Sequence, residues 1–366
     1  MKKWLPEFEL ILLLFLAWRI FLAVVGYLAT IFVPLRIDFL GPTPWANLDG
    51  VHYLSIAQNG YYQYEQAFFP LYPLLIRFVS RWFLLSPQYV GLVISHLSFF
   101  GGLWFFYSLS KNFVAKPANS LWAVALLFLF PTSFFFAAVY TESLFFLLAL
   151  GTAVAAKRRK WWLAGILGML ASLTRLFGVF LLIIVVWEYL RQEDWRSQKR
   201  DIFTFLLIPL GLAVYMIYLW RSTKDPLAFF HAQPAFGAER SGEDLILLPQ
   251  VLWRYGKIIL TVPFFSLNYQ VAIFELATFI LGLGLIWKGW RQRLPSAYLL
   301  YALAILLTPT FTGTLSSMPR YFLSAFPLFF VLGNMHNKWL KIILACLFFI
   351  GLSISTAAFL GGYFVA

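Results

Sequence analysis

The stretch LILLLFLAWRIFLAVVGYLATIFVP, residues 10–34, decides the fold class of this chain. As a helix it is long enough to cross about 30 Å of hydrocarbon, and Arg19 is its one charged residue. The stretch is longer than the apolar core of a signal peptide, and no small-residue cleavage site follows it. We therefore expect it to remain in the protein as a membrane anchor.

The whole chain of 366 residues shares this apolar character. Hydrophobic residues make up 61% of it, aromatic residues 20% and charged residues 12%, whereas a soluble domain has about 25% charged residues. This composition excludes a soluble enzyme, a secreted scaffold and a disordered protein. The sequence predicts an all-α polytopic membrane protein that forms a single domain over residues 1–366, and a lone cysteine, Cys346, excludes an intrachain disulfide.

The basic residues define the predicted topology. The net charge is +13, but the lysines and arginines stand in short clusters between apolar stretches, which is typical of cytoplasmic loops and not of a nucleic-acid surface. Since the chain must cross out and back between two such clusters, we expect about eleven transmembrane helices and a cytoplasmic N-terminus. The clusters are Lys2–Lys3 and residues 111–116, 157–160, 191–200, 288–293 and 338–341.

Two segments on the predicted external side are informative. Residues 35–88 form the first external loop, and its apolar half carries Arg77 and Arg81, which suits a juxtamembrane helix in the bilayer interface. Residues 161–190 must cross twice, so each span has only about fourteen residues at a rise of about 1.5 Å. We therefore expect Thr174 and Arg175 to lie at the floor of an external cavity.

The first external loop contains a candidate catalytic group. A short helix is predicted to start at Asp49, a good N-cap residue, and to stop at Gly60. At helical spacing Asp49 lies beside His52 and Tyr53. The carboxylate is either a helix cap or, beside an imidazole at the membrane surface, a general base for a hydroxyl group. His52 is either structural or part of that site.

Three further charged residues are expected on the same side. Glu142 is either an acid that stabilises a helix N-terminus or a site residue. Arg175 stands between apolar neighbours and needs an anion, which is either Glu142 or a bound phosphate. Arg320 either extends to the interface or joins the same site. Arg19 should have an internal partner, which the sequence does not name.

Cofactor signals are lacking in the sequence. No pair of Cys or His residues has metal-ligand spacing, and no glycine-rich phosphate loop follows a strand. We predict no structural metal and no required cofactor. The sequence is compatible with a divalent ion.

Several motifs carry a resemblance to a known family. DGVHYLSIAQNGY (49–61) followed by AFFPLYPLLIR (67–77) resembles the first luminal loop of the GPI mannosyltransferase II (PIG-V-like) family. Further blocks stand in the family's order: FPTSFF (130–135), YTESLF (140–145), LTRLFG (173–178) and PRY (319–321). Two departures affect the sugar or the acceptor: Asn47–Leu48 where the family often has Arg-Trp, and Leu176–Phe177 in place of a proline-containing pair.

The resemblance implies a GT-C-like bundle and an inverting glycosyltransferase, here a prokaryotic-type member in the cell membrane. Such enzymes use a polyprenyl-phosphate sugar as donor and an essential Asp of the first external loop, which is Asp49 here. The expected reaction moves a sugar, mannose by analogy, to a hydroxyl of a lipid-linked or surface-glycan acceptor on the extracytoplasmic side. The predicted substrate-binding residues are His52, Tyr53, Glu142, Arg175 and Arg320.

Two rival functions come from other classes. A multi-spanning transporter or flippase of a lipid-linked substrate would also have many spans, but its polar residues usually lie near the bilayer midplane in repeated halves, and neither feature is detected. A non-catalytic scaffold would not require five ionisable residues to lie on one face: Asp49, His52, Glu142, Arg175 and Arg320. Nucleic acid is not an expected partner.

Overall fold

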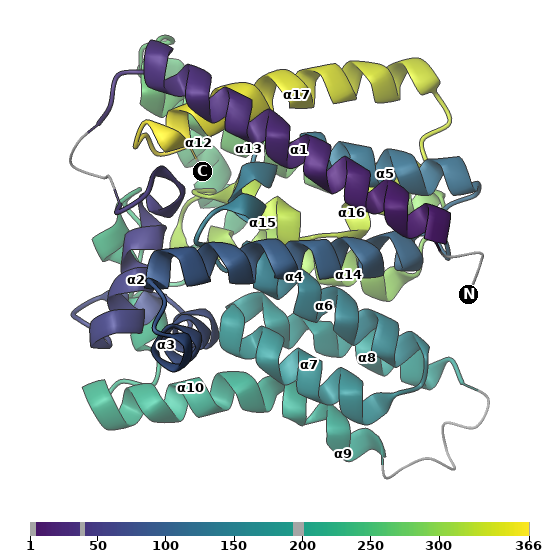
Figure 1. The fold of residues 1–366 in the computed structure, drawn as a ribbon, viewed down its shortest axis with the longest axis horizontal. Helices are drawn as coiled ribbons and strands as arrows, with labels where there is room; N and C mark the ends of the chain where they lie inside the picture. Colours follow the sequence, from purple (N-terminus) through teal and green to yellow (C-terminus); the bar gives the residue numbers. More distant parts are fainter. Residues whose placement is uncertain (1–4, 37–40, 193–200, 366) are drawn as a thin grey trace. The chain divides into compact units, whose positions relative to one another are not determined.

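A computed structural model describes residues 5–36, 41–192 and 201–365 (Figure 1). Every regular element in these ranges is an α- or 3-10 helix, as the apolar runs predicted. The predicted cluster of residues 191–200 falls mostly outside the described residues.

Five helices in the described ranges are long and apolar enough to span a membrane, which confirms a multi-pass membrane protein. Four further apolar segments are shorter: Pro117–Leu129, Trp161–Thr174, Leu176–Leu190 and Ser296–Thr312. The count of about eleven spans stays a prediction. The five span-length segments are Glu7–Phe32, Pro87–Ser110, Ile202–Thr223, Leu267–Arg291 and Lys338–Leu360.

The chain divides into two compact units. Unit 1 comprises residues 1–58, 72–151 and 329–365, and unit 2 comprises residues 59–71 and 152–328. The chain passes from one unit to the other several times, and the single-domain assignment stays a prediction.

Unit 1 is built on three long helices, α1 (Leu5–Phe32), α4 (Pro87–Ser110) and α17 (Lys338–Leu360), with α5 (Pro117–Leu129) packed against α4 and α17. Aromatic rings fill the space between them. The Trp18 and Phe99 centroids are 5.1 Å apart, and Phe99 stacks on Phe136 at 4.2 Å. Both Phe99 and Phe136 are buried, so the helices of unit 1 are joined by dispersion contacts between rings.

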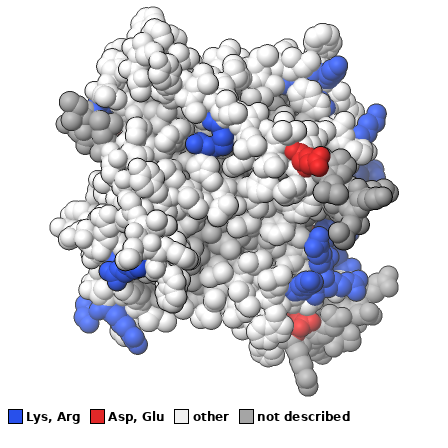
Figure 2. Space-filling view, viewed as in Figure 1, with Lys and Arg blue, Asp and Glu red and all other residues white. Residues whose placement is uncertain are grey.

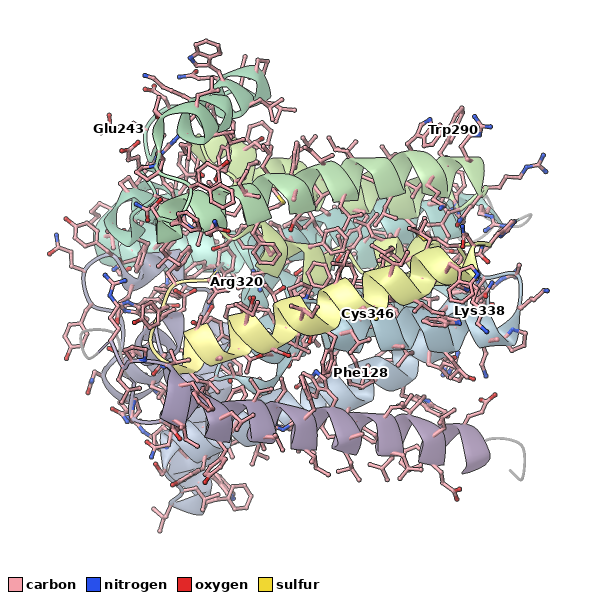
Figure 3. The ribbon with its side chains drawn as sticks, turned by 90° about the horizontal axis from the view of Figure 1, so that it is seen from above. Phe128, Glu243, Trp290, Arg320, Lys338 and Cys346 are labelled. Atoms are coloured by element: carbon pink, nitrogen blue, oxygen red, sulfur yellow. The ribbon has the colours of Figure 1, made fainter. Side chains whose placement is uncertain are left out.

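Charged and polar contacts join the ends of the unit 1 helices. At one end, Lys111 Nζ lies 2.6 Å from Glu7 Oε1, which joins the end of α4 to the start of α1. Lys338 begins α17 and Cys346 lies midway along it (Figure 3). At the other end of α17, the Arg36 N–H donates to Gly361 O. Two predicted cytoplasmic clusters therefore lie at helix ends, and the side of the membrane that they face stays a prediction.

Unit 2 contains the short helix pair that the sequence predicted in residues 161–190. Helix α7 (Trp161–Thr174) ends at Arg175, and the 3-10 turn η5 (Leu176–Phe180) leads into α8 (Leu181–Leu190). Helix α7 packs closely on α10 (Leu207–Thr223), because Gly211 lets the backbones meet: a Cβ there would lie 2.3 Å from Met169 O.

The remaining helices of the described ranges include one more of span length, α13. In unit 2, α13 (Leu267–Arg291) packs on α14 (Ser296–Leu307) and α15 (Met318–Ser324), and α12 packs on α13. On the face drawn in Figure 2, Lys and Arg form small separate patches in a broad uncharged surface. The other helices are α2 (Asp49–Asn59), α3 (Leu71–Phe83), α6 (Glu142–Lys157), α9 (Ile202–Phe205), α11 (Ala228–His231), α12 (Leu248–Thr261) and α16 (Pro327–Gly333).

Candidate functional site

The predicted base stands at the first residue of helix α2 in unit 1. The helix begins at Asp49 and ends before Gly60, whose φ of +93° matches the predicted glycine stop. The Asp49 side chain is half-buried. Leu48 has a φ of +55°, a conformation that a branched residue adopts only when its surroundings impose it. The turn that presents Asp49 is therefore held by tertiary contacts.

Tyr140 supplies the contact that holds this turn. Its hydroxyl donates to Asn47 O at 3.0 Å and accepts from the Asp49 N–H at 3.2 Å. The phenol thus bridges the backbone on both sides of Leu48. Because Tyr140 is buried, its hydroxyl replaces water as the partner of both backbone groups.

Asn47 anchors the same turn to the end of α17. Its side chain is fully buried, and Nδ2 donates to Phe359 O at 3.0 Å while Oδ1 accepts from the Gly41 N–H at 2.9 Å. Asn47 is one of the positions at which the sequence departs from the family motif. The structure gives it a structural role that the sequence did not indicate.

The segment before α6 lies against α2 at a second point. The Tyr53 hydroxyl lies 3.3 Å from Thr141 Oγ1, and the Tyr53 ring packs edge-on against Tyr72 at 5.5 Å. Glu142 follows as the first residue of α6 and is buried, whereas His52 is half-buried on α2. Unit 1 therefore brings the helix that carries Asp49 next to the segment that carries Glu142, and a shared role for these residues stays a prediction.

Tyr72 continues this set of polar contacts from Tyr53 to helix α4. Its hydroxyl donates to Gly91 O at 2.9 Å and lies 2.8 Å from Ser95 Oγ. Burial, with smaller contributions from Tyr53 and Glu142, raises the pKa of the Tyr72 phenol well above its usual value. Tyr72 is therefore a permanent hydrogen-bond donor behind Tyr53.

Arg77 has a role that the sequence missed. It was expected on a helix in the bilayer interface; a helix, α3, does form over these residues, its place in the interface stays a prediction, and the Arg77 guanidinium points to α2. Nε donates to Ala57 O at 2.7 Å and Nη2 donates to Ile56 O at 2.6 Å. These are among the last carbonyls of α2, which have no partner within their own helix. Arg77 therefore ties α3 to the helix of Asp49.

The predicted phosphate-binding arginines lie in unit 2. Arg175 follows the last residue of α7, in extended conformation, and its side chain is only 9% exposed. The Gly178 N–H donates to Arg175 O at 3.0 Å, and a Cβ at Gly178 would lie 2.2 Å from Ser172 N. Only glycine allows η5 to fold back this closely, so Gly178 fixes the point at which Arg175 leaves the helix.

One aromatic ring joins Arg175 to Arg320. The Arg175 guanidinium lies 5.4 Å from the Phe177 centroid and 5.5 Å from the Tyr321 centroid. The Arg320 guanidinium lies 5.7 Å from the same Tyr321 ring. Each contact is within cation–π range. The structure thus places two cations that the sequence separates widely against one aromatic ring.

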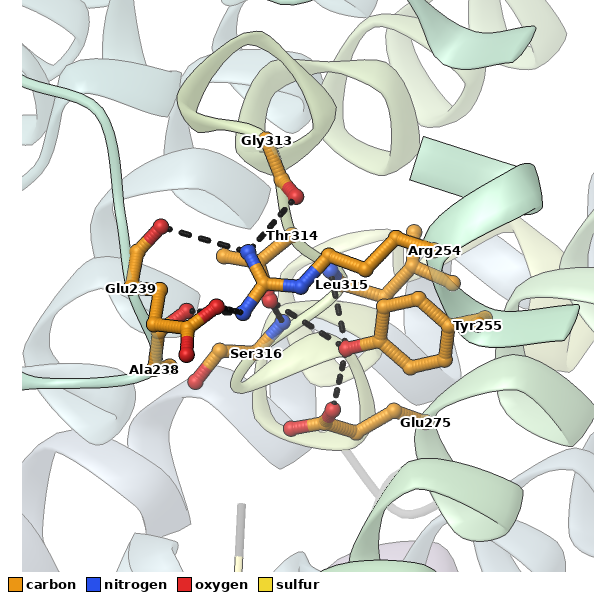
Figure 4. Close-up of polar contacts among 9 residues, drawn as sticks. All are labelled: Ala238, Glu239, Arg254, Tyr255, Glu275, Gly313, Thr314, Leu315 and Ser316. Carbon is orange, nitrogen blue, oxygen red and sulfur yellow. Dashed lines mark hydrogen bonds and ion pairs between the residues drawn. The ribbon is translucent and has the colours of Figure 1, made fainter. Parts of the chain in front are cut away.

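A polar network fixes the loop that leads to Arg320 (Figure 4). The Tyr255 hydroxyl donates to Glu275 Oε2 at 2.5 Å and accepts from the Leu315 N–H at 3.0 Å. Glu275 Oε1 accepts from the Ser317 N–H at 3.0 Å. Burial, followed by the nearby Glu275 carboxylate, raises the pKa of Tyr255 well above its usual value. The phenol therefore stays protonated and donates to the carboxylate.

Two more arginines hold the outer side of this loop. Arg254 donates to Gly313 O at 3.3 Å and forms an ion pair with Glu239 at 2.8 Å. Arg240 donates to Ser316 Oγ at 3.1 Å. Residues 313–317 are therefore held from several directions just before α15 begins.

The predicted site residues fall into two sets. Asp49, His52, Tyr53 and Glu142 belong to unit 1, and Arg175 and Arg320 belong to unit 2. Their roles in one reaction stay predictions. Arg19, also in unit 1, has its guanidinium over the Trp45 ring at 5.1 Å, so its partner is aromatic.

No group of three or more His, Cys, Asp or Glu residues that could hold a metal ion occurs in the ranges that the structure describes. Catalysis without a metal stays a prediction.

Comparison with known proteins supports the family resemblance over the first half of the chain. Residues 42–193 match the family model described as mannosyltransferase (PIG-V). The chain is similar to GPI mannosyltransferase 2 of Drosophila pseudoobscura pseudoobscura, with 32% identity over 132 residues. This match covers 29% of the chain and 28% of the relative, so the chain spans less than a third of that protein's length.

The fold is similar to a crystal structure of the Archaeoglobus fulgidus oligosaccharyltransferase, tethered to an acceptor peptide by a disulfide bond. The TM-score is 0.44 at 14% sequence identity, and the superposition covers 99% of this chain and 56% of that one.

Proposed function

We propose that the chain is an inverting glycosyltransferase that moves a sugar, expected to be mannose, from a polyprenyl-phosphate donor to an acceptor hydroxyl on the extracytoplasmic face. The observation that carries the proposal is the match of residues 42–193 to the mannosyltransferase (PIG-V) model. The matched stretch includes Asp49, His52, Tyr53, Glu142 and Arg175, and Arg320 lies beyond it.

Asp49 is the proposed general base. As the acceptor oxygen attacks the anomeric carbon, its proton passes to the Asp49 carboxylate. The bond between the sugar and the phosphate oxygen breaks on the opposite side, and the lipid phosphate leaves with the electron pair. The half-buried position at the start of α2 suits this role, because the Tyr140 bridge fixes the backbone at Asp49 and the residue is still partly exposed.

Arg175 and Arg320 are the proposed phosphate ligands. Their guanidinium groups meet at Tyr321, and each planar fork can bind two phosphate oxygens. Charge that develops on the leaving phosphate would be stabilised there without reorganisation of the side chains. A single phosphate as leaving group does not in itself require a divalent ion.

The remaining predicted site residues, His52, Tyr53 and Glu142, are proposed to position the sugar. His52 is half-buried, and its ring nitrogens can hydrogen-bond sugar hydroxyls. Glu142 is buried at the start of α6, so it would act from behind the groups that face the sugar. Tyr53 is buried and lies against Thr141, so it would act by holding α2 beside the start of α6. The expected acceptor is a lipid-linked or surface glycan.

A transfer assay tests the proposal. Purified protein in liposomes is given a panel of radiolabelled polyprenyl-phosphate sugars with membrane lipids or surface glycans as acceptors. We expect one donor to yield labelled glycan with the opposite anomeric configuration. Movement of intact lipid-linked sugar between leaflets, without any glycosidic product, would support a flippase and reject the proposal.

A further inference from the structure

Helix α12 (Leu248–Thr261) has two unlike faces. Val251 and Tyr255, one helical turn apart, are buried in unit 2. Trp253 and Leu260 point outward and are 76% and 86% exposed. A helix with one large exposed apolar face needs something to cover that face.

The exposed face continues toward a membrane span. The link from α12 to α13 contains Phe264 and Phe265, which are 60% and 93% exposed. Helix α13 begins at Leu267 and is one of the span-length apolar helices. The start of a span lies near a bilayer surface, and a link of a few residues keeps the end of α12 close to it.

The composition of the exposed face also fits a lipid surface. Lys257 is exposed and lies one turn after Trp253, so it shares that face. A tryptophan, a leucine and a lysine on one face are typical of a helix in the interface, where the lysine reaches the headgroups.

The buried face of α12 holds the loop of residues 313–317. Tyr255 accepts from the Leu315 N–H and donates to Glu275, while Arg254 donates to Gly313 O. The same loop leads into α15 and Arg320. One helix therefore connects an exposed apolar surface with an arginine of the candidate site.

We propose that α12 lies in the surface of the lipid bilayer and that its buried face positions Arg320 through Tyr255 and the 313–317 loop. The second half rests on the proposed function, whereas the first half does not. Tyr255 is thus a positioning residue.

Spin labels at single cysteines test the position of α12. In a Cys346→Ser background, Trp253→Cys and Leu260→Cys are labelled and reconstituted in phosphatidylcholine–phosphatidylglycerol nanodiscs that hold one copy each. Glu243→Cys, at an exposed acidic position of the same loop region (Figure 3), is the control. Collision with oxygen, which is enriched in lipid, is compared with collision with a water-soluble nickel chelate.

We expect both α12 positions to collide several-fold more with oxygen, relative to the chelate, than position 243 does. Equal ratios at all three positions would overturn the proposal, because the face would then be in water. A raised ratio only in discs that hold two copies would also overturn it, since a second copy would then cover the face. Neither outcome depends on enzyme activity.

A second pair of variants tests the positioning of the loop. Phe311 is exposed next to the loop, so a label at Phe311→Cys reports on local mobility. Tyr255→Phe removes the hydroxyl that contacts Leu315 and Glu275, and the matched control is Tyr269→Phe, whose ring only packs on Phe264 among the described contacts. We expect a more mobile spectrum in Tyr255→Phe alone.

Kinetics complete the test of the positioning role. If Arg320 binds donor phosphate, Tyr255→Phe should raise the donor KM several-fold, with the acceptor KM and kcat nearly unchanged. An unchanged spectrum and an unchanged donor KM would overturn the positioning role. A mobile loop in a protein that transfers no sugar would support the contact between Tyr255 and the 313–317 loop and reject the proposed function instead.

Discussion

The acid in unit 1 and the arginines in unit 2 are held by different means. Around Asp49, neutral hydrogen-bonding groups of Tyr140 and Asn47 fix the backbone and leave the carboxylate itself half-buried. Around Arg175 and Arg320, the charged groups themselves lie against the ring of Tyr321. The acid is supported through the backbone on either side of it, whereas the two cations lie directly against an aromatic surface.

The largest expected effect concerns Asp49. Asp49→Asn keeps the side-chain volume and an oxygen that can cap the helix, but removes the basic carboxylate. We expect turnover to fall about a hundredfold or more, while expression and thermal stability stay unchanged. Initial rates with a saturating donor measure this. Near-normal turnover would show that Asp49 only caps α2. The backbone contacts around Asp49 would then not serve a catalytic base.

The next largest effect is expected at Arg175. Arg175→Lys keeps the charge but loses the planar fork, so donor use should weaken by about 1 to 3 kcal/mol, with acceptor affinity hardly changed. Donor and acceptor kinetic parameters, determined separately, check this.

A double mutant separates phosphate binding from a structural ion pair. If Arg175 only balances Glu142, Arg175→Ala should lower stability and Glu142→Gln should restore it together with activity. Recovery of stability without recovery of activity would support the phosphate role.

A smaller effect is expected at Tyr140. Tyr140→Phe removes the bridge between Asn47 O and the Asp49 N–H, so the folded state should lose about 1 to 3 kcal/mol through unsatisfied buried groups. Thermal unfolding measures the loss, with Tyr269→Phe as the matched variant. A loss no greater than in Tyr269→Phe would mean that backbone support is not what holds Asp49.

The last prediction concerns the topology and is measured by labelling, not by activity. Single cysteines at positions 159, 174 and 196 in the Cys346→Ser background are treated with an impermeant maleimide on intact cells. We expect positions 159 and 196 to stay unlabelled, because their basic clusters are predicted to be cytoplasmic. Labelling at either position would place the short helices α7 and α8 differently from the prediction.

The sequence by itself determined the helical membrane character, the short helix pair in residues 161–190 and the helix that runs from Asp49 to Gly60. Hydropathy, helical period and glycine stops are properties of neighbouring residues, so they can be read without a structure. It also singled out Arg175, because an arginine between apolar neighbours is costly unless something holds it, while a shared role of Arg175 and Arg320 stays a prediction.

Only the tertiary structure decided what holds these groups. Tyr140 reaches Asn47 and Asp49 from a distant part of the chain, Tyr321 joins Arg175 to Arg320, and Arg77 turns from the expected interface to the end of α2. Nothing in the local pattern distinguishes these side chains from other polar residues in apolar surroundings. Their partners are set by which helices pack together, because a buried polar group takes whichever complementary atom the packing brings within about 3 Å.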